Sequence, residues 1–224
     1  MFHNIKVGQP ETKIRRIHGF GGIEKQNPTA EETIDNLKKI WSFRSYAVGF
    51  KFKFPAQFDT FPEIVNELKS GLPIRLVVLS RTNLIKQAVS RQNMRRLKTR
   101  FGAGSNLECQ KDYPEIDHGR FIVDIADTIS YARNSQKDEK RLVKEVGTLE
   151  QFGCSAMFVN YEEIVADQKA VTDKIFQFLG VPSVQVLGSK YKKATADDLS
   201  EAVENYQELC EAVSQTEFRD LLDR

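Results

Sequence analysis

The sequence predicts an α/β protein whose sheet is mainly parallel. Two nearly continuous apolar runs, residues 74–80 and 156–161, have the composition of strands that are buried on both faces, as strands of parallel sheets are. After each run the apolar residues recur at helical spacing. Strands and helices that alternate along a chain favour a parallel sheet flanked by helices.

The composition is that of an ordinary soluble globular chain. Its 224 residues are 40% hydrophobic and 29% charged, which is enough for one core, so we expect a single domain over residues 1–224. The net charge of +2 favours no class of partner, so any anion site must come from local clustering. No apolar run approaches the roughly 18–20 residues of a membrane span, and the first twenty residues lack the apolar stretch of a signal peptide.

The three cysteines are widely spaced and form no metal-binding motif, so we expect reduced thiols, a cytoplasmic location and no metal.

Three elements are predicted before the first apolar run. A helix begins near Thr29, because Thr29 and Glu32 have the spacing of a capping box. Residues 46–55, "YAVGFKFKFP", alternate in polarity and end in proline, as a strand does. A short helix in 61–73 is closed by glycine and proline.

Further helices are predicted after the first apolar run, separated by a long loop over 101–117. They extend from Arg81 to about Thr99, over most of 121–153, over 167–182 and over 195–215. Gly180 and Pro182 end the third of these helices. Thr195 and Asp198 give the last one a second capping-box spacing.

A candidate anion site lies in residues 74–92, "IRLVVLSRTNLIKQAVSRQ". Arg81 stands at the carboxyl end of a predicted strand, where parallel sheets bind their ligands. Its five donors suit a phosphate or a carboxylate. Ser90, nine residues later on the following helix, could add a hydroxyl donor. The alternative is an arginine that caps carbonyls and a serine on a solvated helix face, and the spacing by itself favours this alternative.

The stretch "LVVLSRTNLIKQAVS" resembles the 3′-phosphate-binding segment of sulfotransferases, which use 3′-phosphoadenosine 5′-phosphosulfate (PAPS) as donor. In that family a strand is followed by an arginine and then by a helix that carries a serine, and the two side chains hold the 3′-phosphate. The resemblance implies this role for Arg81 and Ser90. The spacing is closer to bacterial carbohydrate and glycolipid sulfotransferases than to the cytosolic steroid and phenol enzymes.

Three other segments are similar to parts of the same family: 48–58, 158–182 and 191–209. Together the resemblance covers about residues 27–224. It implies a P-loop-NTPase-like sulfotransferase fold and transfer of a sulfuryl group from PAPS to a hydroxyl, with a carbohydrate or glycolipid as the expected acceptor. By analogy with phosphoryl transfer, such a reaction needs positioning and charge stabilisation and no metal.

The chain departs from the family at its N-terminus. Sulfotransferases carry a loop rich in Gly, Ser and Thr there, whose backbone amides hold the 5′-phosphosulfate. The nearest stretch here, 5–16, has Glu11 in place of a basic residue and Lys13 in place of glycine. Two hypotheses follow. The fold is N-terminally incomplete, or the chain is a degenerate member that binds nucleotide or glycan without turnover.

Two residues are candidate catalytic residues, Lys53 from the resemblance and His118 from its position in the sequence. Lys53 occupies the place of a histidine in the family, and it could stabilise the sulfuryl oxygens or act as a base if it is desolvated. Alternatively Lys51 and Lys53 mark a solvated strand face. His118 follows Asp117 and is the other candidate base, although a surface histidine is the simpler interpretation.

Basic residues gather in two places. Residues 90–100 contain Arg91, Arg95, Arg96, Lys98 and Arg100. They could bind an anionic acceptor, the nucleotide or a nucleic acid, but a solvated helix face is the commonest explanation. No aromatic residues are interleaved as in RNA-binding proteins, so we expect no nucleic-acid partner. Lys192 and Lys193 are the nearest match to a late basic segment that closes over the 3′-phosphate in the family.

Overall fold

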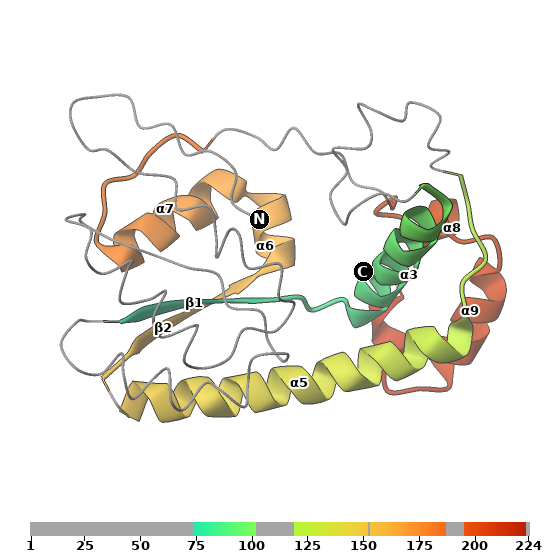
Figure 1. Cartoon of the computed structure of the whole chain (residues 1–224), viewed down its shortest axis with the longest axis horizontal. Coiled ribbons are helices and arrows are strands. Elements are labelled where there is room, and N and C mark those ends of the chain that lie inside the picture. The colour runs from blue at the N-terminus through green and yellow to red at the C-terminus, as the bar shows by residue number, and fades with distance from the viewer. Residues whose placement is uncertain (1–73, 102–118, 152, 187–194, 223–224) are drawn as a thin grey trace. The chain divides into compact units, whose positions relative to one another are not determined.

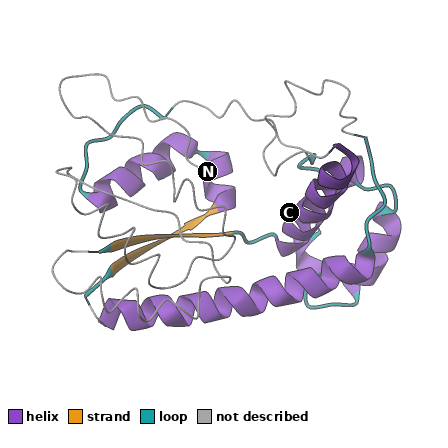
Figure 2. Ribbon diagram, viewed as in Figure 1, coloured by secondary structure: helices purple, strands orange, loops and turns teal. Residues whose placement is uncertain are grey.

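The computed structural model describes residues 74–101, 119–151, 153–186 and 195–222. The described chain divides into two compact units, which we call the sheet unit (74–80 and 138–186) and the helical unit (81–137 and 195–222). The elements predicted before residue 74 and the loop 101–117 lie outside the described residues, apart from residue 101. Figure 1 labels the elements, and Figure 2 shows which of them are helices and strands.

The sheet unit contains two parallel strands. Strand β1 (Arg75–Ser80) pairs with β2 (Ser155–Asn160) over its whole length, from Arg75 opposite Ser155 to Ser80 opposite Asn160. The chain between the strands contains helices, as the connection between parallel strands usually does. The structure therefore confirms an α/β protein with a parallel sheet formed by the two apolar runs.

In the sheet unit, helices pack against the two strands (Figure 1). Helix α6 (Tyr161–Ala166) follows β2 directly, and no pattern in the sequence predicted it. Helix α7 (Gln168–Leu179) contacts both strands. The C-terminal end of α5 (Ile125–Gln151) contributes Leu149 to a small apolar cluster with Leu76.

The ends of α7 agree with the helix signals in the sequence. The Asp167 side chain accepts a hydrogen bond from the backbone N–H of Ala170 at 2.9 Å, as an N-cap residue does. At the other end Gly180 adopts a left-handed conformation with φ of 68°, and its N–H bonds the carbonyl of Gln177. A left-handed glycine is a common way for a helix to end.

The prediction that both strands are buried on both faces is wrong for the described structure. Val78 and Val159 are buried, but Leu79 is 58% exposed and Phe158 is 48% exposed. The described part of the sheet has only two strands, so neither has a described neighbour on both sides. Strands that are hydrophobic all round are typical of wider parallel sheets, whose faces are covered.

The elements of the helical unit pack around an apolar core. It contains α3 (Leu84–Phe101), the first part of α5, α8 (Leu199–Ala202), α9 (Tyr206–Ser214) and the short 3-10 helix η2 (Arg219–Leu221). The buried core residues are Leu84, Ile85, Val89, Phe121, Val123, Ala132, Leu199, Ala202, Val203, Leu209, Val213 and Phe218.

The predicted single helix over 195–215 is wrong, because α8 and α9 are separated at residues 203–205. A bridge between Phe121 and Val203 interrupts the helix there, with the N–H of Phe121 bonded to the carbonyl of Ala202 at 3.0 Å. The Asn205 side chain also bonds both backbone groups of Val123. These partners lie about eighty residues away in the chain, so a pattern of apolar spacing within the segment could not indicate them.

Candidate functional site

The carboxyl ends of β1 and β2 carry polar residues. Ser80 and Asn160 are the last residues of the two strands and lie opposite each other. The Ser80 hydroxyl donates a hydrogen bond to Asn160 Oδ1 at 2.6 Å. Sequence reasoning did not select this pair, although the signal was present, since each apolar run ends in a polar residue. Ligands of parallel sheets bind beyond this edge.

Arg81 is the first residue after β1 and begins the helical unit, where it is half-buried. The predicted position of Arg81 at the end of a strand is therefore confirmed. Helix α3 begins three residues later and carries Ser90, which is also half-buried. Arg81 and Ser90 thus belong to the same unit, and each side chain is partly accessible.

The turn between β1 and α3 is held by Asn83, which is 4% exposed. Asn83 Oδ1 accepts a hydrogen bond from the N–H of Lys86 at 2.9 Å, and this bond caps the start of α3. Asn83 Nδ2 donates to the carbonyl of Leu221 at 2.8 Å. Sequence reasoning missed Asn83, although an asparagine immediately before a helix is a recognised start signal.

A later part of the chain, at Thr195, contacts α3 close to Ser90. Asn93 lies three residues after Ser90, so the two are neighbours on the helix surface. Asn93 is buried, and its Nδ2 donates to the hydroxyl of Thr195 at 3.1 Å. Thr195 follows Lys193 by two residues, so the described chain resumes beside α3 just after the predicted lysine pair. Lys192 and Lys193 themselves lie outside the described residues.

Most of the basic stretch on α3 is used in contacts within the helical unit. The guanidinium of Arg91 lies 4.2 Å from the centre of the Tyr131 ring, and that of Arg96 lies 4.9 Å from the centre of the Phe121 ring. Arg95 Nη1 is 3.4 Å from Asp127 Oδ2. Cation–π contacts and ion pairs of this kind stabilise packing. Three of the five basic residues therefore have a structural explanation that requires no ligand.

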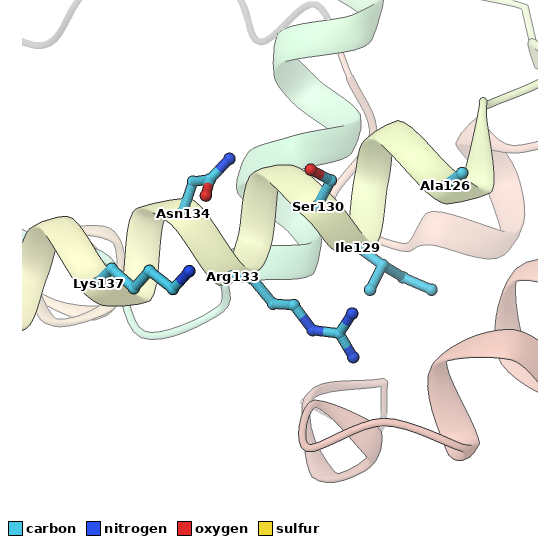
Figure 3. Close-up of a pocket in the computed structure, with 6 residues that line it drawn as sticks. All are labelled: Ala126, Ile129, Ser130, Arg133, Asn134 and Lys137. Atoms are coloured by element: carbon cyan, nitrogen blue, oxygen red, sulfur yellow. The ribbon is translucent and has the colours of Figure 1, made fainter.

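A hollow of about 430 Å³ lies on the surface of α5 (Figure 3). Its lining residues are Ala126, Ile129, Ser130, Arg133, Asn134 and Lys137. All six come from one helix, and Arg133 extends away from that helix (Figure 3). Arg133 meets the Glu217 carboxylate with two hydrogen bonds, of 2.9 and 3.1 Å. This ion pair raises the pKa of Arg133 and lowers that of Glu217.

Because Glu217 neutralises Arg133, and because the described residues of the wall all come from one helix, the hollow is a weak candidate for an anion site.

The candidate catalytic residues Lys53 and His118 lie outside the described residues, and so does the segment 5–16. Within the described ranges, no three of the residue types His, Cys, Asp and Glu are grouped so that they could hold a metal ion. No helix in those ranges has the length and apolar character that crossing a membrane requires.

Comparisons of the chain with known protein families, with curated proteins and with solved structures found no match.

Proposed function

We propose that this protein is a sulfotransferase that moves a sulfuryl group from PAPS to a hydroxyl of a carbohydrate or glycolipid. One observation carries the proposal. Parallel strand β1 ends at Ser80 and is followed directly by the half-buried Arg81, and the helix that starts three residues after Arg81 carries the half-buried Ser90. The resemblance of residues 76–90 to the 3′-phosphate-binding segment of sulfotransferases gives this arrangement its proposed ligand.

In this proposal Arg81 and Ser90 hold the nucleotide through its 3′-phosphate. The guanidinium fork of Arg81 makes charge-assisted hydrogen bonds, and the Ser90 hydroxyl adds a neutral one. The acceptor hydroxyl attacks sulfur in line, the sulfur–oxygen bond to the phosphate breaks, and adenosine 3′,5′-bisphosphate leaves. Lys53 or His118 would take the acceptor proton or stabilise the sulfuryl oxygens. Lys192 and Lys193 would add charge beside the 3′-phosphate.

A second candidate function is nucleotide or glycan binding without turnover. The observation in its favour is the stretch 5–16, where Glu11 stands in the place of a basic residue. A carboxylate there would repel the 5′-phosphosulfate, whereas the 3′-phosphate half of the site would be unaffected.

One experiment distinguishes the two functions. The protein is incubated with PAPS and a set of carbohydrate hydroxyl acceptors. We expect formation of adenosine 3′,5′-bisphosphate that depends on the acceptor. The Arg81→Ala variant should lower kcat/KM about tenfold or more, because a charge-assisted bond contributes about 1.5–3 kcal/mol. The Arg95→Ala variant removes a guanidinium from α3, the helix that carries Ser90, and should have little effect, since Arg95 pairs with Asp127 at the surface.

Nucleotide binding measured in parallel separates the remaining cases. Binding of PAPS without product, with every acceptor in the set, would favour the binding module over the enzyme. Absence of both nucleotide binding and product would contradict the enzyme and a nucleotide-binding module.

A further inference from the structure

The C-terminal segment 216–222 is anchored in the core of the helical unit. Phe218 is 2% exposed and belongs to the same apolar cluster as Leu84 and Ile85, the first residues of α3. Leu221 and Leu222 pack against this cluster. The end of the described chain and the beginning of α3 therefore share one packed region.

Two polar contacts add to this packing. The first is the hydrogen bond of 2.8 Å from Asn83 Nδ2 to the carbonyl of Leu221, which joins residues 138 apart in the chain. The second is the two-bond ion pair of Arg133 with Glu217. Asn83 links the segment to the β1–α3 turn, because the same side chain accepts the capping hydrogen bond from Lys86.

Burial makes the contact at Asn83 costly to lose. A buried amide that loses one partner keeps the full cost of its desolvation, whereas an exposed amide would bond water instead. Movement of segment 216–222 would leave Asn83 Nδ2 and the Leu221 carbonyl to find other partners. This contact therefore links the position of Asn83 to that of segment 216–222.

We infer that Asn83 is a positioning residue for Arg81, through which segment 216–222 holds the β1–α3 turn in the geometry that binds a 3′-phosphorylated nucleotide. The nucleotide part of this inference rests on the proposed function, but the coupling between turn and segment rests on the contacts alone. Coupling between two sites is reciprocal, so nucleotide binding should also order the segment.

The first test uses no ligand. Backbone hydrogen exchange of residues 82–87 is compared in the wild type, in Phe218→Leu and in Thr128→Val. Phe218→Leu loosens the segment and leaves the turn residues unchanged. Thr128→Val is the control, because Thr128 is fully buried on α5 and bonds Gln92, not the segment. At conditions adjusted to equal global stability, exchange at 82–87 should rise about tenfold in Phe218→Leu only. Equal exchange in both variants would overturn the coupling.

The second test measures nucleotide affinity. Asn83→Ser keeps a good helix cap but is too short to reach Leu221, so it separates the two roles of Asn83. We expect the Kd for adenosine 3′,5′-bisphosphate to rise about fivefold or more in Asn83→Ser and in Phe218→Leu, and to stay near wild type in Thr128→Val. Bound nucleotide should slow exchange of residues 216–222.

The outcomes distinguish the two proposals. If the wild type does not bind the bisphosphate, the proposed function fails, and the exchange test still decides the coupling. If the wild type binds it and the Kd is unchanged in both Asn83→Ser and Phe218→Leu, the positioning role of Asn83 is refuted and the proposed function stands.

Discussion

Guanidinium groups are common near protein surfaces, and aromatic rings or carboxylates of the same protein usually contact them. On α3 this is the case for Arg91, Arg95 and Arg96, which contact an aromatic ring or a carboxylate. Arg81 differs in its place, since it directly follows the carboxyl end of a parallel strand. That edge is where parallel sheets bind ligands, and this is the physical reason for giving Arg81 more weight than its neighbours.

The ion pair of Arg133 with Glu217 gives a prediction for acid stability. The hydrogen bond from Arg133 lowers the pKa of Glu217 below the usual 4.5 of a glutamate, and it raises the pKa of Arg133, which stays charged throughout. A carboxyl with a lowered pKa contributes stability that is fully present above its ordinary pKa. That contribution is lost as pH falls through the lowered value.

The melting temperature of the wild type should therefore fall more between about pH 6 and pH 3 than that of Glu217→Gln. The difference should be small and should shrink at high salt, because both side chains are well exposed. Thermal melts of the two proteins at these pH values, with and without salt, measure it. Parallel pH curves for the two proteins would contradict this account of the ion pair.

At the scale of elements, local signals in the sequence predicted both strands and the end of one helix, but not the point where a distant segment interrupts a helix. Apolar runs predicted β1 and β2, and Gly180 predicted the end of α7. Residues 121–153 were predicted to be mostly helical, and α5 lies within them. Apolar spacing failed over 195–215, because Phe121 and Val123 supply the hydrogen bonds that separate α8 from α9.

Substitution of three glycines in the sheet unit tests whether their positions require glycine. Gly180 and Gly153 have positive φ values, of 68° and 88°, which an L residue adopts only with strain. Gly180→Ala and Gly153→Ala should each lower the free energy of unfolding by about 1–2 kcal/mol. Gly147 lies inside α5, and an added Cβ there meets no described atom within 4 Å outside the backbone of its own helix, so Gly147→Ala should raise that free energy by up to about 1 kcal/mol.

Urea unfolding of the three variants measures these differences. Gly153→Ala separates strain from crowding, since an added Cβ there meets nothing within 4 Å, whereas at Gly180 it would meet Arg75 Nη1 at 2.6 Å. Because the end of the Arg75 side chain can move, Gly180→Ala should be only slightly worse than Gly153→Ala. A neutral effect at both positions would show that these turns do not require glycine.

At the scale of the whole molecule, the sequence could predict that Arg81 follows a strand and that Ser90 lies on the next helix. It could not predict the contacts that hold these residues in place. Arg81 and Ser90 are recognisable because they lie within one short stretch. The contacts that fix this stretch join Asn83 to Leu221 and Asn93 to Thr195, across 138 and 102 residues. Such long-range pairs depend on the packing of the helical unit, which no local pattern encodes. The predicted single domain and the cytoplasmic location stay predictions.

The central claim is that Arg81 and Ser90 recognise a 3′-phosphate. The measurement is calorimetric titration with adenosine 3′,5′-bisphosphate and with adenosine 5′-monophosphate. The wild type should prefer the bisphosphate. Arg81→Ala should weaken bisphosphate binding about tenfold or more, and Ser90→Ala about fivefold. Arg95→Ala should bind like the wild type. A wild type without preference for the 3′-phosphorylated nucleotide, or an Arg81→Ala variant that keeps this preference, would contradict the claim.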